Sequence, residues 1–524
     1  MKIPFSDQAY DQMLASLFVR YPSFGSVGAG AYKPGLERMR EMCRRMGDPQ
    51  TKFRTIHVAG TNGKGSTCNM LAADLAASGL KVGLYTSPHI LDFRERARII
   101  ETDRERAGRG ESQVTLIPRE AVWDFIQSHN GDIEELNLSF FEITTAMAFD
   151  WFASCNVDIA VIETGLGGRL DATNVITPEI SVITNIGYDH MDLLGPTLSD
   201  IAGEKAGIIK PGVPVVIGES GPESDPIFTR RAASLGSPLT FADAGGFGSL
   251  SQQSVRTATE SFGPDCVAIG PSQASLGPSP SIRPGVASGF TESICMLSAR
   301  AEGLEPAVAR GPVYPMAAAC YATRCVSEAA EGLDLKGSYQ AKNLNTVLTA
   351  LKVLGREPDM AAISHAAAIC HFHGRWETLL ESPKTICDIG HNEHGLKYNF
   401  RQLDDLLDNG TYTDLVMVYG SVKDKDVDAV LKILPQRAHI IFTAADNHRA
   451  MPAGELLRRA DHKGAEIGGS VRESVRKALD RCKVLEAEAA GRGTLAKPLL
   501  YIGGSTYVVS EAVAYMNGDR NNKQ

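Results

Sequence analysis

Short apolar runs alternate with longer amphipathic runs along most of the chain. Helix-like patterns follow Lys64, cover residues 140–155, and occupy a stretch that ends near Pro211 and Gly212. Strands alternating with helices are typical of a parallel sheet with helices on its faces, so we predict an α/β fold. The strands expected in the first half are residues 55–59, 81–86, 157–163, 180–186 and 213–217.

A second series of strands begins after Gly374 and predicts a second α/β domain. Its strands are expected at residues 385–389, 415–419, 439–443 and 499–502. Residues 340–354 have the pattern of a packed amphipathic helix, so we assign them to the first domain. We therefore expect domains at 1–372 and 373–524, with a hinge near residues 371–374.

Residues 243–290 differ in composition from the rest of the first domain. Of these 48 residues, 22 are glycine, serine or proline. Such a segment has too few apolar side chains to bury much surface, so we interpret it as a surface insertion.

Composition excludes several classes of protein. The 53 Lys and Arg residues against 62 Asp and Glu give a net charge of −9, without the basic run that nucleic-acid binding requires. No run of 18 apolar residues predicts a membrane span, and the N-terminus lacks a secretory signal pattern. The ten cysteines form no Cys-x-x-Cys pair, Cys320 and Cys325 coming closest. We expect a cytoplasmic protein with reduced thiols.

A glycine-rich loop between a strand and a helix carries the most specific chemistry. Residues 57–67 read His-Val-Ala-Gly-Thr-Asn-Gly-Lys-Gly-Ser-Thr. Backbone N–H groups at such a helix start can hold phosphates, with Lys64 as a point charge. The match to G-x-x-x-x-G-K-[ST] is imperfect, because Val58 replaces the first glycine and Gly65 follows the lysine. The alternative is a turn without a ligand, but a turn requires neither the lysine nor glycines on both sides of it.

Two candidate metal ligands follow neighbouring strands. Glu163 ends an apolar strand, and His190 follows the next one. Since ligands of open α/β sheets bind at the carboxyl ends of the strands, both side chains should face one crevice. A carboxylate there suits Mg²⁺, which screens phosphate charge. The alternative is a solvated acid and a hydrogen-bonded core histidine. Ser87 could complete the metal shell or form a Ser-Pro turn. The spacing alone predicts that Lys205 lies on a helix surface.

These motifs together resemble the dihydrofolate synthase/folylpolyglutamate synthase family of the Mur ligase superfamily. The similarity rests on residues 57–67, 85–89, 163–174, 189–195 and 204–210. It covers most of residues 10–220 and, more thinly, 335–510. The resemblance implies a P-loop ATP-binding domain over 1–372 and a smaller Rossmann-like glutamate-ligase domain over 373–524, with ATP between them.

The resemblance also implies a role for individual residues. Lys64, Lys205 and His190 would be catalytic, Lys205 being carbamylated, and Ser87, Glu163 and His190 would bind Mg²⁺. ATP contacts would come from Thr61, Asn62, Gly63, Lys64, Gly65, Ser66, Asn343, Arg375, Asp388 and His391. The substrate pocket would be lined by Pro34, Gly35, Leu36, Glu37, Ser139, Phe140, Phe141, Glu142, Leu170, Asp171 and Ala172.

The sequence departs from the family pattern at two places. The family's Asp-Gly-Ala-His-Asn is here Asp-Ile-Gly-His-Asn at residues 388–392, and Tyr339 precedes Gln340 where the family has histidine. The activity that the resemblance implies is ATP-dependent addition of L-glutamate to dihydropteroate and to folate γ-glutamyl chains, through an acyl phosphate, by a monomer.

Two other functions are weighed against this one. A UDP-muramyl peptide ligase would need a further N-terminal domain, for which about 55 residues before the phosphate loop are too few. A nucleotide-binding regulator would bind nucleotide independently of glutamate and release no ADP.

Overall fold

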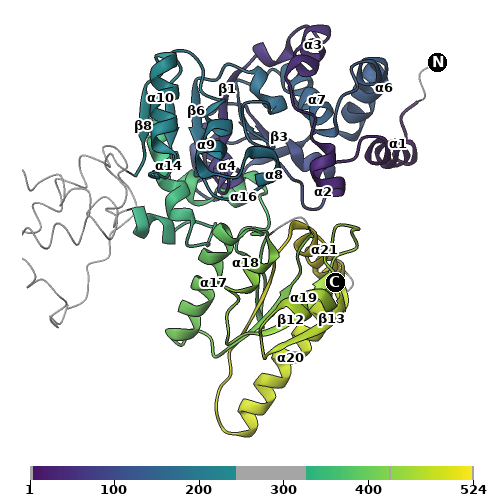
Figure 1. The fold of residues 1–524 in the computed structure, drawn as a ribbon, viewed down its shortest axis with the longest axis vertical. Coiled ribbons are helices and arrows are strands. Elements are labelled where there is room, and N and C mark those ends of the chain that lie inside the picture. The colour runs from purple at the N-terminus through teal and green to yellow at the C-terminus, as the bar shows by residue number, and fades with distance from the viewer. Residues whose placement is uncertain (1–3, 244–325, 424–425, 522–524) are drawn as a thin grey trace, which may run out of the picture. The chain divides into compact units, whose positions relative to one another are not determined.

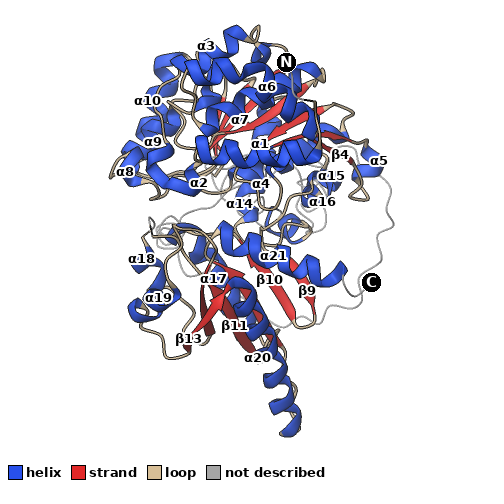
Figure 2. Ribbon diagram, turned by 90° about the vertical axis from the view of Figure 1, so that its right-hand side faces the viewer, coloured by secondary structure: helices blue, strands red, loops and turns tan. Residues whose placement is uncertain are grey.

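The computed structural model describes residues 4–243, 326–423 and 426–521. Apart from residues 243 and 326, these belong to one compact unit, Met1–Ala242 with Ser327–Gln524. Two sheets with helices packed on their faces make up this unit (Figures 1 and 2). Within the described ranges, every helix is too short or too polar to span a lipid bilayer.

The first sheet has eight strands in the order β4-β3-β2-β5-β1-β6-β7-β8. The run from β2 to β8 is parallel, whereas β3 and β4 pair in antiparallel fashion at one edge. The strands are β1 Arg54–Ala59, β2 Val82–Tyr85, β3 Ala97–Glu101, β4 Gln113–Leu116, β5 Ile159–Glu163, β6 Ile180–Ile183, β7 Val215–Ile217 and β8 Leu239–Phe241.

Helices pack on both faces of this sheet. Helix α4 contacts β1, β2 and β5 as well as α14, while α7 packs against β2 among the aromatic residues of an apolar core. The longer helices are α1 Asp7–Arg20, α3 Glu37–Arg45, α4 Lys64–Ala77, α6 Arg119–Glu135, α7 Phe140–Ser154, α9 Leu198–Ala206, α10 Asp225–Leu235 and α14 Gln340–Val353. The short ones are α2 Phe24–Val27, η1 Gly28–Ala31, η2 Pro49–Thr51, η3 Phe93–Arg96, α5 Arg104–Ala107, η4 Ala172–Val175, α8 Met191–Leu194, α15 Met360–Ser364 and α16 Ala366–Cys370.

The second sheet has six strands in the order β13-β12-β11-β14-β10-β9. Helices α17, α18 and α19 cover one apolar face, and α20 and α21 cover the other. The strands are β9 Glu377–Glu381, β10 Lys384–Asp388, β11 Asp414–Tyr419, β12 His439–Ala444, β13 Ala465–Ser470 and β14 Pro498–Gly503. The helices are α17 Glu393–Asp408, α18 Val427–Leu431, α19 Ala453–Arg459, α20 Val471–Gly491 and α21 Thr506–Asn521.

The α/β class predicted from the sequence is confirmed, and each predicted strand corresponds to an observed one. Both sheets are mainly parallel, as predicted, and each ends in antiparallel pairs at one edge: β2 with β3 and β3 with β4 in the first sheet, and β9 with β10 in the second. The reason is connection length: only two residues separate β9 from β10, and β2 reaches β3 without a crossover long enough for a parallel return. The helix expected to end near Pro211 stops earlier, at Ala206.

Two expectations from the sequence concern residues that the structure does not describe. The predicted insertion at 243–290 lies outside the described residues except for Asp243, and so do Cys320 and Cys325. The six cysteines within the described ranges are all free thiols.

Candidate active site

The phosphate loop connects the end of β1 to the start of α4. Gly63 has a left-handed backbone conformation with a φ of 81° and forms the N-cap of α4. A Cβ atom there would lie 2.2 Å from Oδ1 of Asn343 on α14, so both the backbone conformation and the packing require glycine. The free N–H groups at the start of α4 belong to residues that line a cavity of about 580 Å³, as a phosphate site requires.

Side chains of this loop hold it in shape. Nζ of Lys64 donates hydrogen bonds to the carbonyl oxygens of Gly60 (2.9 Å) and Thr61 (3.2 Å). The backbone N–H of Asn62 donates to Oδ1 of Asn185 (2.9 Å). The Ser66 hydroxyl accepts a bond from Gln340 on α14 (3.1 Å). The loop is therefore ordered by contacts with α14 and with the segment after β6, as well as by its own sequence.

Glu163 ends β5 next to the phosphate loop. Its strand pairs with β1 in a register that places Glu163 opposite Val58. The side chain is buried, and within the described part of the chain it accepts one hydrogen bond, from the backbone N–H of Ser87 (3.0 Å). Burial raises the pKa of Glu163, while the positive charge of Lys64 acts in the opposite direction. The carboxylate has lone pairs left for a cation.

His190 lies in the same cavity lining as Ser87 and Glu163. Its backbone is left-handed, with a φ of 51°, and its ring packs edge-on against Phe24 with centroids 4.9 Å apart. Asp189 accepts the backbone N–H of His190 (2.9 Å). The described residues contain no group of three His, Cys, Asp or Glu side chains placed to hold a metal. One carboxylate, one imidazole and the Ser87 hydroxyl nevertheless fit a cation that keeps water and phosphate oxygens among its ligands.

Lys205 is buried on α9, which corrects the helix-surface position that spacing alone predicts. Nζ donates to the carbonyl oxygen of Gly60 in the phosphate loop (3.0 Å). Burial, with Lys64 as a nearby like charge, lowers the pKa of Lys205 to about 7. Gly168 lets the loop after β5 approach this helix, since a Cβ at Gly168 would lie 2.9 Å from the carbonyl oxygen of Glu204.

On the side of the second sheet, Asp388 ends β10 and is almost fully buried. Its carboxylate accepts hydrogen bonds from the Tyr339 hydroxyl (2.7 Å), the N–H groups of Trp376 (2.9 Å) and Gly390 (2.7 Å), and Nδ2 of Asn399 (2.8 Å). The other predicted nucleotide residues of this region, Asn343, Arg375 and His391, line the same cavity as Asp388.

Most residues expected to bind the acceptor substrate also line this cavity. Ser139 and Glu142 form a capping box at the start of α7, with the Ser139 N–H donating to Glu142 at 2.7 Å. The lining formed by the described residues includes Gly35 but not Pro34, Leu36 or Glu37. The other predicted members present are Phe140, Phe141, Leu170, Asp171 and Ala172.

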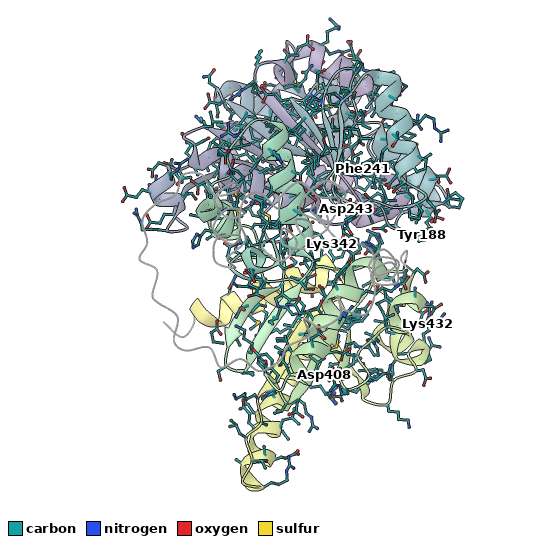
Figure 3. The ribbon with its side chains drawn as sticks, turned by 90° about the vertical axis from the view of Figure 1, so that its left-hand side faces the viewer. Tyr188, Phe241, Asp243, Lys342, Asp408 and Lys432 are labelled. Carbon is teal, nitrogen blue, oxygen red and sulfur yellow. The ribbon has the colours of Figure 1, made fainter. Side chains whose placement is uncertain are left out.

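The sequence analysis missed several charged and aromatic residues of the cavity. Arg96 is buried, and its guanidinium lies 5.2 Å from the centre of the Phe140 ring. No sequence motif predicts a role for it. Lys342, labelled in Figure 3, donates to Glu219 and to the hydroxyl of Tyr398. The signal that could have found Lys342 is its position two residues after Gln340, on a helix that already carries Asn343.

Two family models match parts of this chain. The Mur ligase middle domain matches residues 126–224, and the Mur ligase glutamate ligase domain matches residues 374–491. A dihydrofolate synthase/folylpolyglutamate synthase of Bacillus subtilis is 32% identical over 433 residues, covering 81% of this chain and 84% of that protein. The chain belongs to the dihydrofolate synthase/folylpolyglutamate synthase family. The family predicted from the motifs is thus confirmed.

Other members of the family differ in length. A probable bifunctional folylpolyglutamate synthase/dihydropteroate synthase of Haloferax volcanii is 31% identical over 492 residues, or 92% of this chain. Because the match covers 48% of that protein, the chain spans about half its length.

Solved structures show the same fold. A Mycobacterium tuberculosis folylpolyglutamate synthase complexed with ADP has a TM-score of 0.70 at 24% identity, covering 97% of this chain and 98% of that one. A Yersinia pestis folylpolyglutamate synthase/dihydrofolate synthase complexed with AMPPNP and Mn has a TM-score of 0.65 at 24% identity, with 97% and 98% covered. Tyr339, where the sequence analysis expects a departure from the family pattern, donates its hydroxyl proton to Asp388.

Proposed function

We propose that this chain is an ATP-dependent ligase that joins L-glutamate to dihydropteroate and to the terminal glutamate of folate γ-glutamyl chains. The observation that carries the proposal is that one cavity is lined by the phosphate loop, the buried acid Glu163 and the buried amine Lys205. The names of its relatives support the folate acceptor. A family structure with Mn, AMPPNP and L-glutamate bound supports the other substrates.

The reaction has two steps. A carboxylate oxygen of the acceptor attacks the γ-phosphorus of ATP, giving an acyl phosphate and ADP. The amine of L-glutamate then attacks the acyl carbon, and an amide, inorganic phosphate and a proton are formed. Acceptor, ATP and glutamate all carry negative charge, so the site must position them and neutralise that charge.

The residues of the cavity divide this work. The N–H groups at the start of α4 and the Lys64 ammonium hold the triphosphate. Ser87, Glu163 and His190 would bind Mg²⁺, which would screen phosphate charge from the incoming carboxylate. The walls of the cavity would limit access of water to the acyl phosphate, whose hydrolysis would consume ATP without forming an amide.

Carbamylation of Lys205 belongs to the same proposal. The neutral amine attacks CO₂, a nitrogen–carbon bond forms, and one proton leaves, so a carbamate with a negative charge replaces the ammonium. A pKa of about 7 leaves about half of the Lys205 amines neutral at pH 7, whereas an ordinary lysine is almost entirely charged there. The burial of Lys205 beside the phosphate loop supports the modification.

We also propose the domain boundary at 372/373, which separates the strands of the two sheets. A monomeric, cytoplasmic enzyme completes the proposal, since its expected substrates are small cytoplasmic molecules and the described cysteines are free thiols.

The test is ADP release with dihydropteroate or tetrahydrofolate as acceptor, each with and without L-glutamate. We expect rapid release only when an acceptor and L-glutamate are both present, together with one new amide for each ADP. Lys64→Ala should abolish release without unfolding the protein, because among the described residues the Lys64 ammonium donates hydrogen bonds only to carbonyl oxygens of the loop. Nucleotide binding without ADP release in all four mixtures would reject the ligase and favour a regulator.

A further inference from the structure

His57 is a buried histidine that neither reaction step uses. It lies in the middle of β1, three residues before Gly60, and its side chain is fully buried. Across β1 and β5 it is paired with Ile162, the residue before Glu163. Nε2 of His57 lies 2.8 Å from the hydroxyl oxygen of Thr173 on η4.

The direction of this hydrogen bond follows from the proton count. The Thr173 hydroxyl has one proton, and it donates that proton to Oδ1 of Asp171 (2.5 Å). Nε2 of His57 must therefore carry a proton and donate it to Thr173. Burial lowers the pKa of His57 to about 3, so the ring is neutral and its other nitrogen, Nδ1, carries no proton. Nδ1 has no hydrogen-bond partner among the described residues, which assigns the role of His57 to Nε2.

Asp171 accepts the Thr173 hydroxyl bond and also binds the loop after β5. Its Oδ1 also accepts the N–H of Thr173 (3.0 Å), and its Oδ2 accepts the N–H groups of Gly165 (2.9 Å) and Leu166 (2.8 Å). Gly165 and Leu166 follow Glu163 directly, and Asp171 lines the cavity. A chain of hydrogen bonds thus runs from the sheet through Thr173 and Asp171 to the turn after Glu163.

We propose that His57 is a positioning residue that fixes the loop over residues 164–176 through Thr173 and Asp171. In this arrangement the loop sets the affinity for the acceptor substrate, whereas the phosphate loop sets the affinity for ATP. The proposal rests on the proposed ligase for the identity of the acceptor, but the ordering of the loop can be measured without it.

Hydrogen–deuterium exchange of residues 164–176 is the first test. Thr173→Val keeps the shape of the side chain and removes the hydroxyl, whereas the matched control Thr173→Ser keeps the hydroxyl. We expect the Gly165 and Leu166 amides to exchange about tenfold faster in Thr173→Val, and at a rate close to wild type in Thr173→Ser. His57→Leu should repeat the effect of Thr173→Val, and His57→Gln, which restores an N–H donor, should reduce it.

Steady-state kinetics separate positioning from general damage. In Thr173→Val we expect KM for dihydropteroate to rise about tenfold while KM for ATP changes less than twofold. The double variant His57→Leu/Thr173→Val should be little worse than either single variant, since both break one chain of bonds.

Four results would overturn the proposal: unchanged exchange in His57→Leu, unchanged exchange in Thr173→Val, equal exchange in the Val and Ser variants, or equal rises of both KM values. If His57→Leu does not fold, His57→Gln is measured in its place, and we expect its Gly165 and Leu166 amides to exchange more slowly than those of Thr173→Val. If the wild type ligates no glutamate, the ligase assignment fails, and exchange still decides the role of His57.

Discussion

Glu163 and Asp388 are buried carboxylates at the carboxyl ends of parallel strands, one in each sheet, and both line the cavity. They differ in their hydrogen bonds. Within the described chain, Glu163 accepts one, from Ser87. Asp388 accepts four, from Tyr339, Trp376, Gly390 and Asn399.

The difference shows how a buried acid can be assigned a role. A carboxylate has about four acceptor positions, so those of Asp388 are filled by the protein itself, while most of those of Glu163 are open. An open, desolvated carboxylate beside a phosphate loop is suited to a cation. A filled one instead holds together the chain segments that donate to it. We therefore expect substitutions of Glu163 to affect chemistry, and substitutions of Asp388 to affect stability.

Within this comparison, the largest effect is expected for Glu163→Gln. The amide keeps the shape and can still accept the Ser87 N–H, but it loses the charge that would bind the metal. We expect the rate of ADP release with acceptor and L-glutamate to fall about a thousandfold. The free energy of unfolding should stay constant or rise, because a buried charge with one partner is removed. Activity within threefold of wild type would contradict the assignment of Glu163 to the metal site.

Asp388→Asn should give the opposite result. The new NH₂ group would face two of the four donors, so two hydrogen bonds are lost and polar groups stay buried without partners. We expect the free energy of unfolding to fall by about 3 kcal/mol, measured by urea denaturation. Loss of activity without loss of stability would mean that Asp388 acts on the nucleotide directly.

The sequence predicted the parts of this site that local patterns encode. The phosphate loop and the strand ending at Glu163 follow from glycine spacing and short apolar runs. The hydroxyl of Tyr339 reaches Asp388 across 49 residues, and His57 reaches Thr173 across 116. The periodicity of apolar residues does not predict such contacts, because they depend on how strands and loops are placed in space. Spacing alone did not predict the burial of Lys205 for the same reason, since the two loops that approach it contain Gly60 and Gly168.

Lys205, like Glu163, is buried beside the phosphate loop and makes one hydrogen bond among the described residues. Replacing Lys205 tests the proposed carbamate. We expect Lys205→Ala to lose about 100-fold in ligation rate, with partial recovery on adding a short-chain carboxylate such as acetate, which could replace the carbamate. Lys210 is a matched control, because burial also lowers its pKa, to about 8, and it lies outside the cavity lining. Acetate should not raise the activity of Lys210→Ala. A fully active Lys205→Ala without additives would contradict the assignment.

The same lysine predicts a pH dependence of stability. The pKa of Lys205 is lowered from 10.5 to about 7 on folding, so between these values the unfolded chain binds one more proton than the folded one. Stability contributed by this group therefore rises with pH over that range. Relative to Lys205→Met, the wild-type free energy of unfolding should increase by about 2 kcal/mol from pH 7 to pH 9 in CO₂-free buffer. A difference that does not vary with pH would mean that Lys205 is solvated.

The smallest effect is expected for Tyr339→Phe. Burial and the adjacent Asp388 raise the pKa of Tyr339, so its hydroxyl remains a donor at working pH. Its removal takes one of four hydrogen bonds from Asp388 and should lower the free energy of unfolding by about 1 kcal/mol, with KM for ATP changing less than threefold. Tyr339→His offers an N–H donor at the same position and should lose less. Should Tyr339→Phe instead cost as much as Asp388→Asn, the four bonds would act as one cooperative unit, and counting filled acceptor positions would not separate structural from catalytic carboxylates.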